Sequence, residues 1–208
     1  VNTAMLATTY RYLAFEIGKK LGGNPNKIFN TSLLIHAVFA IGLITVGIAV
    51  GDWYICNYLN IVPDKISDAI FVFHISIITA ALSTLFVPFQ GLQVAYEKFT
   101  VNAAIDIISQ SIKLAAIILL IYSDTNRLRL YSMIMLSYTF FSCVLYVGYC
   151  VMHYWNVIKP TVYKDSKLIK EMLQYALWTM FGALASVGKS QGSAVITVSY
   201  THLTLPTN

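Results

Sequence analysis

Long apolar segments separated by short polar ones recur along the chain from residue 28 onward. Four of them have the length and composition that a helix needs to cross a bilayer, about 20 consecutive mostly apolar residues. They are residues 28–51, 69–96, 99–123 and 130–158. A further apolar stretch, residues 172–188, has the character of the beginning of another span. The pattern predicts an all-α fold, a polytopic transmembrane helix bundle.

The two ends of the chain differ from these segments. Residues 1–18 begin without a methionine and are already apolar, so we interpret them as the end of an earlier helix and the chain as a fragment of a longer bundle. Residues 197–208 contain the polar stretch VSYTHLTLPTN, whose back-translation matches a transposon-derived adaptor used in sequencing libraries. We interpret this stretch as an adaptor artefact and exclude it from functional arguments. We expect the native gene to continue with an apolar helix after Ile196.

The composition supports a membrane protein, because 57% of the residues are hydrophobic and 11% are charged, whereas soluble domains carry about 25% charged residues. The net charge of +5 fits anionic phospholipid headgroups better than nucleic acid, because the basic residues lie in short loops without a nucleic-acid-binding motif. The three cysteines show no CxxC spacing, so neither a disulfide framework nor a metal site is expected.

Lysine and arginine residues in alternate loops predict the orientation, since loops rich in them stay in the cytoplasm. Nine lie on one side of the predicted membrane: Arg11, Lys19, Lys20, Lys27, Lys98, Lys159, Lys164, Lys167 and Lys170. Three lie on the other: Lys65, Arg127 and Arg129. The first side should therefore be cytoplasmic, in a multi-pass protein of the inner (plasma) membrane.

The sequence gives little support to an enzyme. No nucleophile stands near a plausible base, the Gly-x-x-x-x-Gly-Lys pattern of a phosphate-binding loop is absent from the sequence, and the outer loops are short. We therefore expect neither catalysis nor a cofactor. Any chemistry should take place inside the membrane.

A polar stripe crosses the third span. Asp106, Gln110 and Lys113 share one helical face because residues at i, i+4 and i+7 lie on the same side. A lysine in the middle of a span costs about 2.5–3.5 kcal/mol on translocon scales, so Lys113 should face the bundle interior or a water-filled cavity. Asp106 either has a similar role or lies at the wet boundary of the membrane. The intramembrane His36 and His74 fit interior hydrogen bonding better than ligand binding.

Four stretches together resemble one family of transporters. They are TTYRYLAFEIGKK at residues 8–20, VPFQGLQVAYEKFTVNA at residues 87–103, the polar-striped helix that follows, and EMLQYALWTMFGALASVGKSQG at residues 171–192. This pattern is similar to that of Wzx-type polysaccharide flippases, of the multidrug/oligosaccharidyl-lipid/polysaccharide exporter superfamily, and covers essentially residues 1–196.

The resemblance implies a transporter of about twelve helices in two halves with a substrate cavity between them. Residues 1–158 would then hold most of the N-terminal half, from the end of helix 2 through helix 6. Residues 159–171 would be the cytoplasmic linker between the halves, and residues 172–196 the start of helix 7. The implied function is to move undecaprenyl-diphosphate-linked oligosaccharide across the membrane by alternating access, for surface polysaccharide biosynthesis.

The same resemblance implies roles for particular residues. Cations would attract the diphosphate, glutamines would contact the sugars, and Asp106 would balance a cation or carry a coupling proton. The cations are Lys113, Arg11 and Lys189, and the glutamines are Gln110, Gln90 and Gln93. The implied partners are the lipid-linked oligosaccharide, anionic phospholipids and a polysaccharide polymerase.

Three alternatives stay open. A drug or metabolite antiporter of the same superfamily would favour carboxylates over lysine in its cavity. In a membrane scaffold without transport, the polar stripe would only hold helices together. A membrane-embedded glycan polymerase would need a long outer loop, which this sequence lacks.

Overall fold

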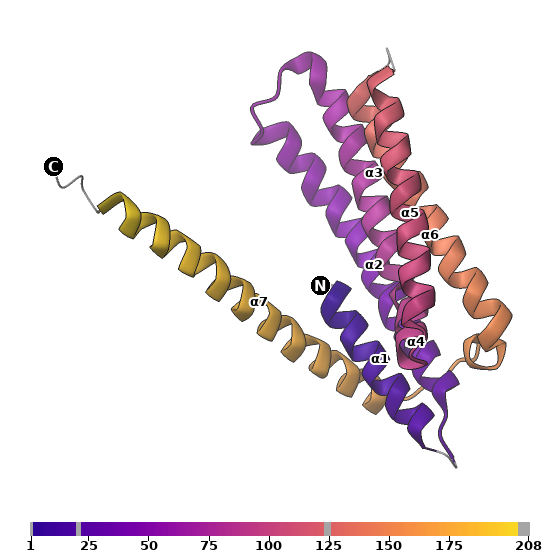
Figure 1. The fold of residues 1–208 in the computed structure, drawn as a ribbon. Helices are drawn as coiled ribbons and strands as arrows, with labels where there is room; N and C mark the ends of the chain where they lie inside the picture. The colour runs from indigo at the N-terminus through magenta and orange to yellow at the C-terminus, as the bar shows by residue number, and fades with distance from the viewer. Residues whose placement is uncertain (1, 20–21, 123–125, 204–208) are drawn as a thin grey trace.

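The structure is a computed structural model that describes residues 2–19, 22–122 and 126–203 (Figure 1), with residues 190–203 described by their backbone alone. The described residues form helices joined by turns and short coil segments. The α-helices are α1 (Asn2–Gly18), α2 (Pro25–Asn57), α3 (Ile66–Leu85), α4 (Val87–Ala95), α5 (Phe99–Leu119), α6 (Arg127–Ile158) and α7 (Ser166–Leu203). Two short 3-10 helices, η1 (Pro63–Lys65) and η2 (Leu120–Tyr122), precede α3 and follow α5.

Four helical segments of the described chain are long and apolar enough to cross a membrane, which confirms the four predicted spans. They are Pro25–Asn57, Pro63–Ala95, Phe99–Tyr122 and Arg127–Ile158. The fifth apolar stretch, residues 172–188, lies in α7. Over its described residues α7 is not one of the four segments, because polar residues such as Gln174 and Thr179 interrupt it.

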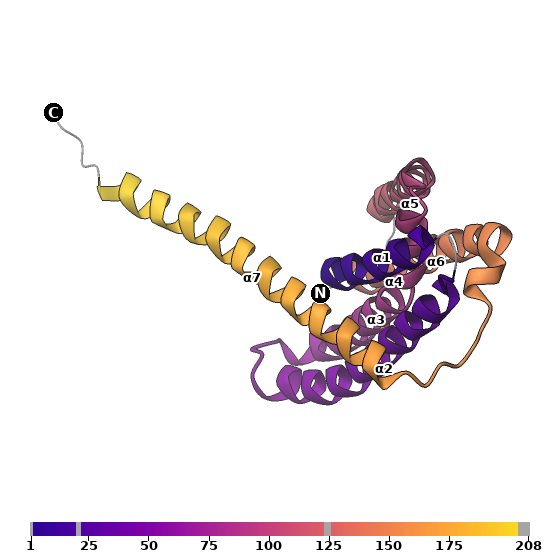
Figure 2. The ribbon, with the colours of Figure 1, turned by 90° about the horizontal axis from the view of Figure 1, so that it is seen from below.

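Among the long helices, α2 packs against α3, α3 against α6, and α6 against α5. Figure 2 shows α2 and α5 on opposite sides of the bundle. The shorter α1 and α4 pack against each other near one end of this bundle. The first turns of α7 pack beside α1, and α7 then leaves the bundle at an angle (Figure 1). Residues 204–208, the last part of the predicted adaptor stretch, lie outside the described residues, and α7 continues through Leu203.

The segment predicted as a single span at residues 69–96 is divided at Phe86, where α3 ends and α4 begins. Pro88 explains the division, because proline has no backbone N–H and its ring clashes with the carbonyl four residues earlier in a continuous helix. The division gives α4 its own direction. Gln90 thereby comes to face α6 across a cavity described below.

Glycines allow two close approaches between helices. A Cβ atom added at Gly51 of α2 would lie 1.9 Å from the Phe73 ring of α3, and one at Gly91 of α4 would lie 2.9 Å from Thr9 of α1. Small residues let helix backbones approach in this way. Gly182 and Gly188 of α7 differ, because an added Cβ would meet nothing within 4 Å at either position.

The connections that carry most of the loop lysines lie together at one end of the bundle (Figure 1). We name this the cationic end and define it by residues 22–27, 95–99 and 158–170. The connection from α2 to α3, the end of α5 and the start of α6 lie at the opposite end, where Asp68 accepts hydrogen bonds from Asn126 and Arg129. Successive connections therefore alternate between the two ends, as the predicted orientation requires. The prediction that the cationic end faces the cytoplasm stays a prediction.

Reporter fusions test the orientation. Fusions at Asn24 and Lys164 should read cytoplasmic, and a fusion at Asp64 should read external, because basic loop residues are retained inside. Alkaline phosphatase and green fluorescent protein fusions measure the two sides independently. An external Asn24 fusion would reverse the orientation and remove the lysines from the cytoplasmic face.

The connection between α6 and α7 is tied to the first turn of α2. The Asn26 side chain donates to the carbonyls of Val157 at 2.7 Å and Lys159 at 2.9 Å, and it accepts from the Tyr163 hydroxyl at 3.1 Å. Beside it, Lys27 pairs with Asp165 at 2.7 Å. The hydrogen bond from Lys27 lowers the pKa of the Asp165 carboxyl, which keeps it charged at neutral and mildly acidic pH.

The coil between α6 and α7 is short. Residues 159–171 were predicted to link two halves of a transporter, which stays a prediction, and α7 begins within them at Ser166. Asp165 accepts hydrogen bonds from the backbone N–H groups of Lys167 and Leu168, both at 3.1 Å. This is the pattern of a helix N-cap, so the last residues of the predicted linker belong to the helix.

Asn26→Ala should lower the free energy of unfolding by about 1–3 kcal/mol, because buried carbonyls would lose their donor. Denaturant titration in detergent micelles would measure the loss. Asn57→Ala is the matched control, since the exposed Asn57 side chain donates to the Trp53 carbonyl of its own helix. Equal losses for the two variants would contradict the importance of this linker attachment.

Candidate functional site

A polar cavity of about 220 Å³ lies where the division between α3 and α4 faces α6. Its lining combines hydroxyl, amide and aromatic side chains from four helices. These are Asn2, Ser83, Phe86, Val87, Gln90, Tyr138, Thr139, Ser142, Cys143 and Tyr146. Polar groups of this kind are expensive in a membrane interior unless they have partners. Thr139 and Tyr146 already bond within the protein, and a polar ligand in the cavity would add a partner for such groups, so the cavity is a candidate binding site.

Asp106 is attached to the cavity wall through Tyr146. The Tyr146 hydroxyl donates a hydrogen bond of 2.8 Å to Asp106 Oδ1, and Gln90 lies within hydrogen-bonding reach of the same tyrosine. Tyr146 is buried, whereas Asp106 of α5 is exposed. The carboxylate thus orients a tyrosine that lines the cavity and does not line it itself.

Lys113 contacts a second tyrosine of the cavity, Tyr138, which lies on α6 like Tyr146. Its ammonium nitrogen lies 4.7 Å from the ring centre of Tyr138, within the range of a cation–π contact. Lys113 is half-buried. Since α5 and α6 run antiparallel, the spacing from Asp106 to Lys113 matches the spacing from Tyr146 to Tyr138. The two intramembrane charges therefore have their partners on another helix, and that helix is α6.

The other predicted site residues lie elsewhere. Gln110, between the two charges, is exposed on α5. Arg11 lies on α1 with its guanidinium 4.2 Å from the ring centre of Tyr175 on α7. Lys189 is exposed far along α7. Gln90 thus lines the cavity from α4, and Asp106 and Lys113 contact its tyrosines from α5. Gln110, Arg11 and Lys189 are not among the lining residues.

Gln93, predicted to contact sugars, lies away from the surface of the described chain. Its side chain is completely buried between α4 and α6, where Nε2 donates to the Tyr146 carbonyl at 3.5 Å and contacts Cys150 Sγ at 3.7 Å. A side chain enclosed in this way has no surface left for a sugar. Gln93 holds the two helices together beside the cavity.

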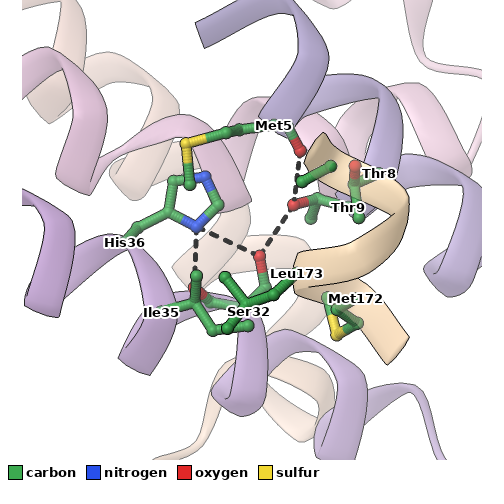
Figure 3. Close-up of a pocket in the computed structure, with 9 residues that line it drawn as sticks. Met5, Thr8, Thr9, Ser32, Ile35, His36, Met172 and Leu173 are labelled. Atoms are coloured by element: carbon green, nitrogen blue, oxygen red, sulfur yellow. Dashed lines mark hydrogen bonds between the residues drawn. The ribbon is translucent and has the colours of Figure 1, made fainter. Parts of the chain in front are cut away.

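A second cavity lies where α1, α2 and the first turns of α7 meet (Figure 3). It is small, about 10 Å³, and hydrogen bonds run along its wall. Thr9 Oγ1 donates to the Met5 carbonyl at 3.0 Å and lies 2.7 Å from the Ser32 hydroxyl. His36 Nδ1 lies 2.7 Å from the Ser32 carbonyl, so the proton resides on Nδ1. Within the described part of the chain His36 Nε2 is buried without a partner.

The second intramembrane histidine has an acidic partner. His74 Nε2 of α3 lies 2.8 Å from Asp52 Oδ1 of α2, and both side chains are partly exposed near the end opposite the cationic end. Both histidines thus form interior or inter-helix hydrogen bonds. His36 differs in that only one of its two ring nitrogens is bonded among the described residues.

The sequence analysis named Gln90 and missed the other residues that line the cavity, among them Tyr138, Ser142 and Tyr146 of α6. A signal for them exists, because they recur every fourth residue and so share one face of the predicted span at residues 130–158. Tyrosines are common where a span meets either membrane surface. In the sequence alone, these tyrosines therefore cannot be distinguished from interfacial ones, and only the packing of α5 against α6 shows their role.

The described residues define a class of protein: all-α, with four helical segments able to span a membrane and a polar cavity lined by α1, α3, α4 and α6. Comparison with protein-family models, curated proteins and solved structures finds no match to the chain.

Proposed function

We propose that the protein is a flippase of the Wzx type, which moves undecaprenyl-diphosphate-linked oligosaccharide across the inner membrane. The observation that carries the proposal is the polar cavity between α3, α4 and α6, with Lys113 and Asp106 attached to its two tyrosines. The resemblance of the sequence to exporters of lipid-linked polysaccharide supports the same function.

The chemistry of the cavity suits this substrate. A diphosphate is anionic and needs cations, and sugars need hydroxyl and amide partners together with aromatic faces on which to stack. Lys113 supplies a cation beside Tyr138, while Gln90 and Ser142 supply hydrogen-bonding groups on the wall. Asp106 fixes the Tyr146 hydroxyl and offers a carboxylate that a coupling proton could neutralise.

In the proposed mechanism the helices of this chain form one wall of a larger transporter of about twelve helices. The cavity is exposed to one side of the membrane at a time, so that the headgroup never enters the hydrocarbon without partners. The cationic end faces the cytoplasm, where the substrate is assembled. The exposed sides of α1 and α7 would then face the second half of the transporter.

Deleting the gene tests this function. A deletion strain should lose its surface polysaccharide and accumulate the lipid-linked oligosaccharide at the cytoplasmic face, and a plasmid copy should restore export. Lectin staining of intact cells and extraction of the lipid-linked intermediates measure the two effects. Intact surface glycan together with new sensitivity to cationic drugs would instead favour the antiporter, for which the exposed carboxylate of Asp106 would be the cation site.

A further inference from the structure

A groove of about 290 Å³ lies between α2 and the connection from α6 to α7, at the cationic end. One wall is the first half of α2, and the other is the linker. The lining residues are Asn30, Thr31, Leu33, Leu34, Ala37, Pro160, Thr161, Val162 and Tyr163. The groove shares no lining residue with the polar cavity.

The α2 wall of the groove continues into an apolar surface. Leu34, Val38 and Ile41 follow each other at helical spacing, with 49%, 62% and 63% of their surfaces exposed. Since α2 is one of the helices able to span a membrane, this exposed stripe lies toward the lipid acyl chains. An acyl chain that enters the groove beside Leu34 can therefore continue along α2 toward the middle of the bilayer.

The linker wall of the groove is positively charged. Lys159 and Lys164 flank its four lining residues, and both are exposed. Within the described part of the chain neither forms an ion pair, whereas the neighbouring Lys27 is neutralised by Asp165. Cations next to a membrane attract anionic headgroups. The groove thus has open positive charge at one end and hydrocarbon surface at the other.

Asn26 and Asn30 hold this groove open in a defined shape. Asn30 Nδ2 donates to the Lys159 carbonyl at 3.1 Å, and its Oδ1 accepts from the Thr161 backbone N–H at 3.3 Å. The linker backbone is therefore bonded to α2 on both sides of Pro160. A site fixed by hydrogen bonds loses little conformational freedom when a ligand enters it.

We propose that this groove binds one anionic phospholipid of the inner leaflet, with its phosphate between Lys159 and Lys164 and one acyl chain along Leu34, Val38 and Ile41. The bound lipid would bridge α2 and the linker at the point where α7 begins. This site is independent of the proposed transport function, because it lies on a different surface.

Lipid binding by the protein expressed from its native gene, in detergent micelles, tests the proposal. Phosphatidylglycerol and phosphatidylcholine with identical acyl chains are titrated separately, and native mass spectrometry counts the retained lipids. Phosphatidylglycerol should be retained at one site with the higher affinity. Lys159→Gln combined with Lys164→Gln should weaken it by about fivefold for each lysine. Lys98→Gln, which removes an exposed cation from the same end, should leave it unchanged.

Two further arms address the acyl chain. Ala37→Phe fills the groove and leaves both lysines in place, so it should also abolish the preferred site. Glycerol phosphate, a headgroup without acyl chains, should fail to displace the lipid. Equal retention of the two lipids, equal effects of Lys98→Gln and the double variant, or displacement by glycerol phosphate would each overturn the proposal. If Ala37→Phe does not fold, the lysine variants decide.

Discussion

Lys113→Ala should lower export of surface glycan by about ten- to a hundredfold, while the protein remains in the membrane at nearly normal abundance. A hydrogen bond to a charged group contributes about 1.5–3 kcal/mol. Without the ammonium group, binding of the anionic headgroup loses this energy. The fold should survive because Lys113 is half-buried and contacts α6 through the Tyr138 ring, which an alanine leaves in place.

Three companion variants make this result specific. Lys113→Arg should retain part of the activity, because a guanidinium also carries a charge and stacks on an aromatic ring. Lys98→Ala removes an exposed loop cation outside the cavity and should export normally. Asp106→Asn keeps an acceptor for Tyr146 but cannot titrate, so it should block export only if the carboxylate couples transport to protons. Wild-type export by Lys113→Ala would make the stripe structural and strengthen the scaffold and antiporter interpretations.

Gly91→Leu should prevent α1 and α4 from packing and lower the free energy of unfolding by about 1–3 kcal/mol or more, as overpacked cores do. Even a Cβ atom at this buried position would lie 2.9 Å from Thr9 Cγ2 and 3.5 Å from the Tyr10 backbone nitrogen. A leucine side chain would need more room between the two helices, where the neighbouring backbone cannot give way.

The matched control is Gly148→Leu on α6, where an added Cβ would meet nothing within 4 Å. Thermal unfolding in detergent, followed by circular dichroism, should give a lower midpoint for Gly91→Leu and a nearly unchanged midpoint for Gly148→Leu. Because Gly91 follows Gln90, we also expect the first variant to export poorly. A Gly91→Leu protein as stable as the parent would show that α1 and α4 are not closely packed.

The sequence predicts the four spans well because the need for apolar length in a bilayer is severe and is visible residue by residue. It places the helix ends less well. The first span was expected at residues 28–51, but α2 begins at Pro25, where the Asn24 side chain accepts a hydrogen bond from the Lys27 backbone N–H. Polar residues at a membrane boundary can continue a helix, so apolar length alone underestimates it.

The candidate site was predicted only in part, for a different reason. Asp106 and Lys113 share one face of a helix, which can be predicted because it depends only on the spacing of residues within that helix. Their partners Tyr138 and Tyr146 depend on how α5 packs against α6, which spacing within one helix does not determine. Arg11 and Lys189 show the same limit, because a cation in the sequence gives no indication of the helix it will face.

The most direct test of the proposed function is to measure flipping in liposomes that contain the protein expressed from its native gene. Undecaprenyl-diphosphate-linked oligosaccharide with a radiolabelled sugar is placed in both leaflets, and a membrane-impermeant glycosidase is added outside. The proposal predicts that wild-type protein lets the glycosidase release nearly all of the label, whereas Lys113→Ala protein releases little beyond the outer-leaflet fraction. Release limited to the outer leaflet with folded wild-type protein would contradict the assignment as a flippase.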